Sequence, residues 1–376
     1  MSNIAEFWSS LGYNGYFFIL LIILFVIHLI VMISRGVILV SKPRTVLPSR
    51  NEGVSVIITC SNKADLLKKN LEVFLKQDYP LYEVIVVDEC SEDDTQDVLA
   101  DLQTRYPHLK TTRIFPDTKF RRTKKIAINI GVLAARYDIL LFTEINCLPE
   151  SDHWIEAMSS HFTPDTAVVI GYSNYMVKEE AISFRRFFRF LWFWKTYVQV
   201  KQKLFVTGNG TNMGYRKKFY LETRGYSRNT QEYIGYDTEM VKKIAPKGKV
   251  RMAKEMEARI LIEEKGFQDW KDDFSYYFAT KQRWPAYVRL MSYLDFFIEG
   301  AFYVLSFYFI FLGLLHKFVA IFVILTFLMD LVVINICLRH LGQKKLFLTS
   351  FTVNTLGFLY KSYYNIYSIF TAKKWR

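Results

Sequence analysis

The sequence predicts an α/β domain with a mostly parallel sheet, flanked by transmembrane helices. Residues 16–33 form an apolar run long enough to span a bilayer. Residues 54 to about 270 alternate short β-branched runs with amphipathic helical patterns, and from Phe296 onward the chain becomes apolar again. This layout suits an enzyme that takes a water-soluble donor and acts on an acceptor at or across the membrane.

Within the central region, strand and helix patterns follow one another in strict alternation. Three short runs rich in Val, Ile or Leu predict strands at residues 54–60, 83–87 and 138–142, and TTRIF predicts a further strand at residues 111–115. Between them, apolar residues at helical spacing predict helices at residues 64–76, 95–106 and 122–136. Alternation at this spacing predicts a parallel sheet with both faces covered.

The first apolar run is too long for a cleaved signal peptide and has no basic segment before it, which predicts a retained anchor. Only Glu6 is charged before the run, whereas four basic residues follow it. These residues are Arg35, Lys42, Arg44 and Arg50. The positive-inside rule then predicts an external N-terminus and a cytoplasmic central domain. We expect an integral protein of the plasma (inner) membrane.

Three segments follow from this pattern: an anchor with a basic linker (1–50), the α/β domain (51–285) and a C-terminal membrane region (286–376). In the last segment, residues 296–315 and 318–338 predict two spans. The apolar stretch 346–370 is broken by polar residues. It is either another span, a re-entrant piece or an interfacial helix.

Composition agrees with a membrane protein. Of the 376 residues 17% are aromatic, and the net charge is +13. We attribute the excess of Lys and Arg to residues that flank membrane segments and face anionic lipid. No nucleic-acid-binding motif is present, so we expect no nucleic-acid partner. The four cysteines form no CxxC pair, which argues against zinc and for free thiols.

Acidic residues stand where two predicted strands end. Asp88 follows the strand 83–87, and Glu144 follows the strand 138–142. Ligands of parallel α/β sheets bind outside the carboxyl ends of the strands, so both positions are site candidates. The alternative, that such acids only cap the next helix, is our interpretation for Asp93 and Asp94.

Four segments in this order resemble membrane-bound family 2 glycosyltransferases of the processive type, which have a GT-A nucleotide-diphospho-sugar-binding domain. They are VSVIITCSNKADLLKKNLEVFLKQDYPLYEVIVVDECSEDDT, TKKIAINIGVLAARYDILLFTEINCLP, GNGTNMGYRKKFY and IGYDTEMVKKI. The resemblance makes residues 51–285 the GT-A domain. It implies transfer of a sugar from a nucleotide-sugar to a lipid-linked or polysaccharide acceptor, with inversion, in cell-envelope polysaccharide biosynthesis.

The resemblance also implies donor and metal sites. The acid after the second strand binds the nucleobase and ribose, a role that falls to Asp88 with Glu89 beside it. The family's Asp-x-Asp motif, which holds Mg²⁺ or Mn²⁺ on the donor diphosphate, corresponds to Glu144-Ile145-Asn146. Both positions keep an oxygen ligand but one negative charge is absent, so we expect weaker metal binding.

Acceptor and catalytic roles follow from the later segments. The segment near the acceptor matches at Asn212, Tyr215 and Arg216. In the Gly-Asp-Asp-like segment, Tyr236 replaces the first acid and Asp237 matches the second. A carboxylate must take the proton of the acceptor hydroxyl, so Asp237 is the expected base and Glu239 the alternative.

The family's Gln/Arg-rich Trp motif is absent after Trp270. The sequence Gln282-Arg283-Trp284 either supplies this acceptor-binding motif at a shifted position or anchors the chain at the membrane surface. If it is an anchor, Lys124 and Lys125 remain, with Arg216, to offset the diphosphate charge.

These departures leave a second hypothesis open, a catalytically impaired pseudo-glycosyltransferase that acts as a membrane scaffold. A transporter is a poorer third, because so few spans are predicted. Two other features are unassigned at this stage. Residues 183–203 mix basic and aromatic side chains, as an in-plane amphipathic segment does. Asp330 is an acid within a predicted span, where charge is costly.

Overall fold

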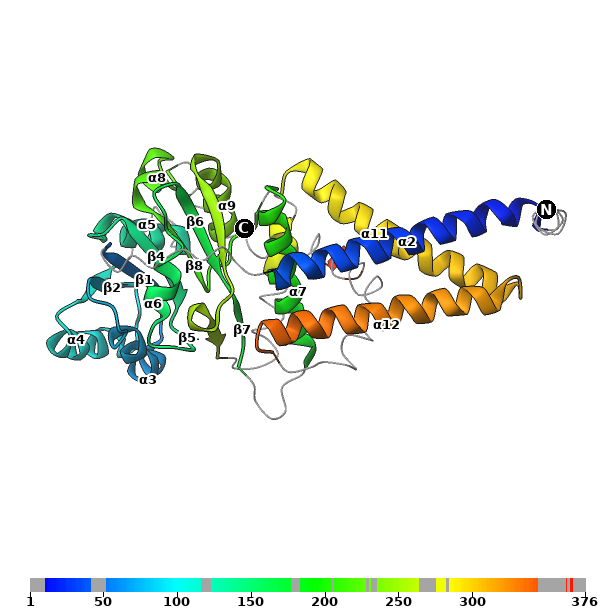
Figure 1. Ribbon diagram of the computed structural model, residues 1–376. Helices are drawn as coiled ribbons and strands as arrows, with labels where there is room; N and C mark the ends of the chain where they lie inside the picture. Colours follow the sequence, from blue (N-terminus) through cyan, green and yellow to red (C-terminus); the bar gives the residue numbers. More distant parts are fainter. Residues whose placement is uncertain are drawn as a thin grey trace. The chain divides into compact units, whose positions relative to one another are not determined.

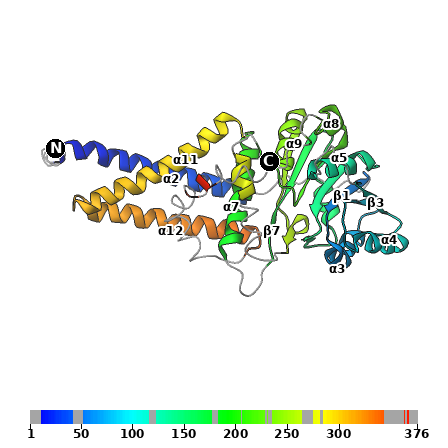
Figure 2. The same cartoon turned by 180° about the vertical axis from the view of Figure 1, so that it is seen from behind.

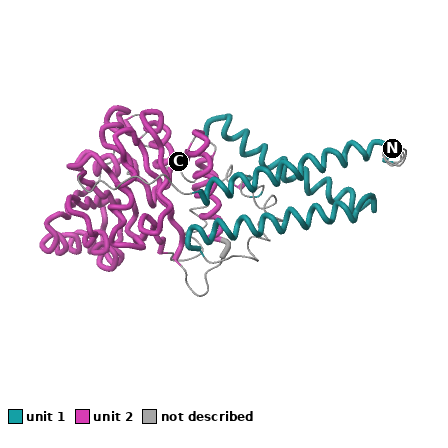
Figure 3. The backbone as a smooth tube through the Cα atoms, viewed as in Figure 1, with its two compact units in different colours: residues 1–42, 284–366 teal, residues 43–283, 367–376 magenta. Residues whose placement is uncertain are grey.

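The computed structural model describes residues 11–41, 52–115, 123–176, 183–204, 206–227, 230, 235–263, 275–281, 284–343, 363, 366 and 367. The chain divides into two compact units (Figure 3). One contains residues 43–283 and 367–376, and the other contains residues 1–42 and 284–366. Each unit is described separately below.

The α/β unit is built on a sheet of seven strands within the described residues, in the order β3-β2-β1-β4-β8-β6-β9. The strands β1 (Val54–Cys60), β2 (Tyr82–Asp88), β3 (Leu109–Arg113) and β4 (Ile139–Glu144) are parallel neighbours. β8 (Met213–Arg216) lies antiparallel between β4 and β6 (Thr166–Gly171), and β9 (Lys249–Ala253) completes the edge. The predicted fold, α/β with a mostly parallel sheet, is confirmed.

Helices cover both faces of this sheet. Figures 1 and 2 show α3 (Ala64–Leu75), α4 (Thr95–Arg105) and α6 (Trp154–Ser159) on one side. On the other side lie α5 (Lys124–Ala134), α8 (Lys217–Glu222) and α9 (Tyr236–Ile244). α5 packs very closely, because a Cβ atom at Gly131 would come within 2.6 Å of Ile57. The core between these layers is made by the buried β-branched runs of β1, β2, β4 and β6.

A smaller sheet lies beside the main one. β10 (Ile260–Ile262) pairs antiparallel with β5 (Cys147–Pro149) and parallel with β7 (Ser173–Tyr175). Two short 3₁₀ turns, Ala245–Lys247 and Met256–Ala258, flank β9. A further helix of this unit is α7 (Ser183–Lys201), which contacts β7 and β9.

The in-plane position expected for α7 stays a prediction, but part of its basic face is buried. Arg186 and Arg189 are only 8% and 5% exposed. The Arg189 guanidinium lies 5.4 Å from the ring centre of Tyr175 on β7. Two of the arginines that suggested a surface helix are therefore packed inside the α/β unit.

The second unit contains three helices that are long and apolar enough to cross a membrane, within the described part of the chain. They are α2 (Tyr13–Val40), α11 (Ala286–Phe311) and α12 (His316–His340). Stacked and edge-on Phe rings hold them together: the ring of Phe25 lies 4.8 Å from that of Phe322 and 6.4 Å from that of Phe302. The predicted stretch 346–370 lies almost wholly outside the described residues.

Charged side chains also connect these helices. His28 Nε2 lies 2.9 Å from Asp330 Oδ1, which joins α2 to α12. Arg35 Nη2 donates to Asp295 Oδ2 at 2.7 Å, which joins α2 to α11. Asp330, which the sequence singled out, is thus a buried acid with a partner on another helix. Such pairs compensate the cost of charge in an apolar environment.

Candidate active site

The carboxyl ends of β1, β2 and β4 meet at one edge of the sheet. The strand register puts Cys60 beside Asp88 and Thr59 beside Glu144. β1 lies between β2 and β4, so the strand order reverses here. In open α/β sheets this switch point is where ligands bind. The structure therefore brings the two strand-ending acids to a common edge, as the sequence predicted.

Asp88 shapes this edge from within. Its side chain is completely buried, and Oδ1 accepts bonds from the Ser91 amide (2.9 Å) and hydroxyl (2.5 Å). Oδ2 accepts a bond from Gln96. These bonds hold the turn after β2, in which Cys90 has φ of 65°, a left-handed conformation that is uncommon for a residue with a side chain. Direct contact of Asp88 with a donor remains a prediction.

Glu89, beside Asp88, is half-buried at the same edge. Burial raises the pKa of its carboxyl; Lys124 acts in the opposite direction and Glu144 in the same one. Glu89, Glu144 and Lys124 therefore share one electrostatic neighbourhood. Asp93, by contrast, caps helices, because its Oδ2 accepts from the Ala64 amide at 3.0 Å and Oδ1 from the Thr95 amide at 3.2 Å. This confirms the capping interpretation for Asp93.

Glu144 lies in a cluster with Lys124 and Tyr236. Lys124, at the first position of α5, forms an ion pair with Glu144 Oε1. Tyr236 donates its hydroxyl to the same oxygen at 3.2 Å. The Lys124 ammonium also lies 4.5 Å from the centre of the Tyr236 ring. Burial acts to raise the pKa of Glu144, but Lys124 and Tyr236 outweigh it and hold the pKa below its ordinary value.

Glu144 and Asn146 are the predicted metal ligands, and both are half-buried at the carboxyl edge. Within the described part of the chain, Asn146 Oδ1 makes a long contact, 3.7 Å, with the Cys147 thiol. Among the described residues, no three His, Cys, Asp or Glu side chains gather into a metal-binding group. One carboxylate and one amide oxygen suit Mg²⁺ or Mn²⁺ as part of a ligand set that donor phosphates and water complete. The set fits a divalent cation if Lys124 leaves Glu144.

Asp237 is held by the glycine-rich loop after α7. Its Oδ2 accepts from the Gly210 amide at 3.3 Å, and its Oδ1 accepts from the Tyr276 hydroxyl at 2.8 Å. A Cβ atom at Gly208 would lie 2.5 Å from the Asp237 backbone, so only glycine permits this approach. The side chain is 2% exposed. Its partner Tyr276 connects it to the Glu144 cluster, because the Tyr276 ring lies 6.0 Å, centre to centre, from the ring of Tyr236.

Glu239 and Lys125 form a separate pair. Lys125 is completely buried, and its ammonium lies 2.6 Å from Glu239 Oε2. Lys243, one turn later on α9, lies 3.3 Å from Glu239 Oε1. Both oxygens of the alternative base thus face lysines. Lys124 and Lys125, grouped by the sequence, reach different acids.

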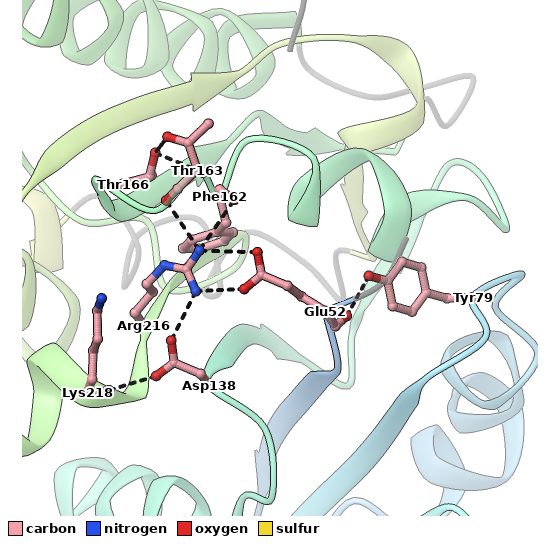
Figure 4. Close-up of polar contacts among 8 residues, drawn as sticks. All are labelled: Glu52, Tyr79, Asp138, Phe162, Thr163, Thr166, Arg216 and Lys218. Atoms are coloured by element: carbon pink, nitrogen blue, oxygen red, sulfur yellow. Dashed lines mark hydrogen bonds and ion pairs between the residues drawn. The ribbon is translucent and has the colours of Figure 1, made fainter. Parts of the chain in front are cut away.

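The three residues of segment 208–217 that were predicted to bind the acceptor lie inside the fold. Arg216 is only 5% exposed and donates to Glu52 Oε2 at 2.8 Å and to Asp138 Oδ2 at 3.0 Å (Figure 4). It pairs with Ile139, the first residue of β4, and so lies at the opposite end of the sheet from Glu144. The structure does not bring Arg216 to the site, because the antiparallel direction of β8 carries the chain away from it.

Tyr215 and Asn212 are also structural. The Tyr215 ring is fully buried and stacks 4.4 Å from that of Phe142. Asn212 is fully buried and donates to the carbonyls of Tyr172 and Ala258, both at 2.8 Å. Neither side chain is accessible to an acceptor in this conformation. Of the other acceptor candidates, Gln282 and Arg283 lie outside the described residues, and Trp284 belongs to the other unit.

Sequence reasoning missed Tyr276 as a partner of Asp237, and it missed a small pocket beside the glycine-rich loop. The pocket has room of about 10 Å³, enough for one water-sized group. Arg189, Trp192, Ser173, Gly208 and Asn209 are among the residues that line it. The only signal in the sequence was the basic and aromatic composition of 183–203, which did not indicate the direction of the side chains.

Comparisons with known proteins agree with this fold. The structure is similar to that of the mannosyltransferase PcManGT from Pyrobaculum calidifontis, solved in complex with GDP-Man and Mn²⁺. The TM-score is 0.53 with 17% identity, over 90% of this chain and 98% of that one. This likeness concerns the fold, which is of the GT-A type.

Residues 55–223 match the family model of glycosyl transferase family 2. The α/β domain of this chain belongs to that family. A curated relative is the dolichyl N-acetyl-alpha-D-glucosaminyl phosphate 3-beta-D-2,3-diacetamido-2,3-dideoxy-beta-D-glucuronosyltransferase of Methanococcus voltae. It is 25% identical over 50% of this chain and 54% of its own length.

Another relative is the poly-beta-1,6-N-acetyl-D-glucosamine synthase of Staphylococcus epidermidis, 25% identical over 27% of this chain and 23% of its own length. The chain thus spans between about a quarter and about half of the length of these two relatives.

Proposed function

We propose that this protein is an inverting glycosyltransferase that moves a sugar from a nucleotide-diphospho-sugar to a lipid-linked or polysaccharide acceptor at the membrane. One observation carries the proposal. Glu144 and Lys124 lie at the carboxyl edge of the sheet, and Tyr236, which touches both, directly precedes Asp237 on α9. A cationic, oxygen-rich donor site thus adjoins a carboxylate suited to proton abstraction.

In this proposal the donor diphosphate occupies the edge formed by β1, β2 and β4. Glu144 and Asn146 would hold a divalent cation, which neutralises the departing diphosphate when bound. Lys124 lies close enough to offset the same charge. Asp88 and Glu89, through the turn after β2, bind the nucleoside. Glu89 is half-buried beside Asp88 and would share this contact.

Asp237 takes the proton of the acceptor hydroxyl as that oxygen forms its bond to the anomeric carbon. The bond from this carbon to the diphosphate oxygen breaks in line, which inverts the configuration. The Gly210 amide and the Tyr276 hydroxyl orient the carboxylate. A general base of this kind works by position first, and its two fixed hydrogen bonds supply that position.

The acceptor and the membrane side follow from weaker support. One relative is named as a polysaccharide synthase and the other as a transferase to a dolichyl phosphate-linked sugar. Both acceptor classes therefore remain in the proposal. Three helices suited to membrane crossing and the basic residues after α2 support an α/β domain on the cytoplasmic side of the plasma membrane.

The alternative is a catalytically impaired scaffold. It is favoured by the low exposure of Asp237 and by the ion pair that neutralises Glu144 in this conformation.

One experiment separates the glycosyltransferase from the scaffold. Protein purified in detergent should be stabilised thermally by some member of a panel of UDP- and GDP-sugars with Mg²⁺ or Mn²⁺. It should then transfer or hydrolyse that sugar. Donor binding without any turnover would favour the scaffold, and no binding across the panel would exclude the glycosyltransferase.

A further inference from the structure

The carboxylate expected to hold a divalent cation already has a cation of its own. Lys124 forms an ion pair with Glu144 Oε1, and its side chain is 19% exposed against 29% for Glu144. The pair is thus half-shielded from water, where opposite charges attract more strongly than on an open surface. A metal ion that approaches Glu144 must displace this ammonium group or share the carboxylate with it.

Tyr236 holds the ammonium group in place. Its hydroxyl donates to the same oxygen, Glu144 Oε1, at 3.2 Å, and its ring lies 4.5 Å from Lys124 Nζ. The Tyr236 side chain is itself fixed by the loop, because a Cβ atom at Gly210 would lie 2.1 Å from the hydroxyl oxygen. Lys124 therefore lies between a carboxylate and an aromatic ring. If its ammonium group moves away from Glu144, it keeps its contact with the Tyr236 ring.

We propose that Lys124 and the divalent cation compete for Glu144, and that the donor resolves the competition by offering its diphosphate to Lys124. Only the second half of this inference, in which the donor diphosphate binds Lys124, rests on the proposed function. Without a donor, Lys124 keeps Glu144 neutralised and the cation binds weakly. With a donor, the diphosphate supplies negative charge for both cations, so cation and nucleotide bind with positive coupling.

The charged groups at the site support this competition between Lys124 and the cation. Glu144 is the only carboxylate in the Glu-Ile-Asn segment, because Asn146 is neutral. Two full cations on one carboxylate repel each other at close range, so only one is bound strongly until an anion arrives. A nucleoside diphosphate brings that negative charge. By linkage, the factor by which the nucleotide improves cation affinity equals the factor by which the cation improves nucleotide affinity.

The first experiment uses Mn²⁺ alone with the full-length protein in detergent, and free Mn²⁺ is measured by electron paramagnetic resonance. Lys124→Gln and Lys124→Met should bind Mn²⁺ roughly tenfold more tightly than wild type, within the range of about 5- to 150-fold typical of coupled sites. Lys124→Arg should resemble wild type because the charge remains. Adding Glu144→Gln to Lys124→Gln should abolish the gain. Lys76→Met, which breaks an exposed pair with Glu72, is the matched control and should have no effect.

Thermal melting of each variant separates loss of fold from loss of binding, and the partly exposed Lys124→Gln is the variant expected to fold best. Equal or weaker Mn²⁺ binding in folded Lys124→Gln overturns the competition. The second experiment adds UDP or GDP, whose affinity in the absence of metal should fall in Lys124→Gln. If no nucleotide binds to wild type, the proposed function fails while the Mn²⁺ result stands. If nucleotide binds equally to both proteins, the donor half of the proposal fails.

Discussion

Arg216 offers a clear test of the site, because sequence and structure give it different roles. The family resemblance assigns it to the acceptor, whereas the structure places it in a network at the opposite end of the sheet. Its guanidinium donates to Glu52, to Asp138 and to the carbonyl oxygens of Phe162 and Thr163. We expect Arg216→Met, which keeps the aliphatic stem, to lower stability and to leave transfer by the folded protein intact.

The expected loss can be worked from these contacts. Glu52 and Asp138 are 40% and 41% exposed, so water can hydrogen-bond to their carboxylates in place of the guanidinium. Each pair is then worth about 0–1 kcal/mol, as at a surface. The two carbonyls lose bonds worth about 0.5–1.5 kcal/mol each. The sum is about 1–5 kcal/mol, or roughly 2–20 °C in Tm for a domain of this size.

Thermal melting in detergent measures the loss, and Arg105→Met is a suitable control because Arg105 makes its ion pairs at an exposed surface. Transfer should be compared at a temperature where both proteins are folded. The structural role is refuted if Arg216→Met melts like wild type but no longer transfers sugar. That result would restore the acceptor role and would require β8 to rearrange when the acceptor binds.

Three other outcomes are expected. Glu144→Ala should lose activity together with its dependence on divalent cations, whereas Glu144→Asp should keep both; full activity of the alanine variant would contradict the metal-binding role. Asp237→Asn should reduce kcat by about 10²- to 10⁴-fold with donor affinity nearly unchanged, and if it is fully active while Glu239→Gln is inactive, the base is Glu239. Burial acts to raise the pKa of Glu83, but Lys110, the Arg136 amide and Ser55 hold it below its ordinary value. A lowered folded-state pKa adds stability above the unfolded value of about 4.3, and this stability is lost as the pH falls further. Between pH 7 and pH 3, the Tm of Glu83→Gln should therefore fall less steeply than that of wild type. Parallel curves of Tm against pH would contradict the assignment.

The elements that could be predicted from sequence are those whose burial is uniform. Residues 54–60 were expected as a strand and form β1 with the same limits, because β-branched residues buried on both faces leave little choice. The third strand was expected at 111–115 and lies at Leu109–Arg113. It is an edge strand with exposed and half-buried residues, so hydrophobicity did not fix its limits.

β8 shows what the sequence could not reveal. The family resemblance put this segment near the acceptor, yet Met213–Arg216 form a strand between β4 and β6. The hydrogen bonds that make it a strand come from two neighbours far away in sequence. The register then decides that Tyr215 enters the core and that Arg216 points to Glu52. The residue types were read correctly as a motif, but the side-chain directions depend on tertiary pairing.

The two departures from the family pattern at the site are physically one change. The resemblance would place acids at positions 146 and 236, where this chain has Asn146 and Tyr236. An acid at 236 would lie beside Glu144 and repel it, unless a metal ion stood between them. Tyr236 instead donates a hydrogen bond to Glu144 and offers its ring to Lys124. With both acids absent, Lys124 forms the ion pair with Glu144, and Glu89 and Arg189 lie in the same electrostatic neighbourhood. The Lys124–Glu144 ion pair therefore needs no metal ion, and under the proposed function a cation is required when a diphosphate adds its charge.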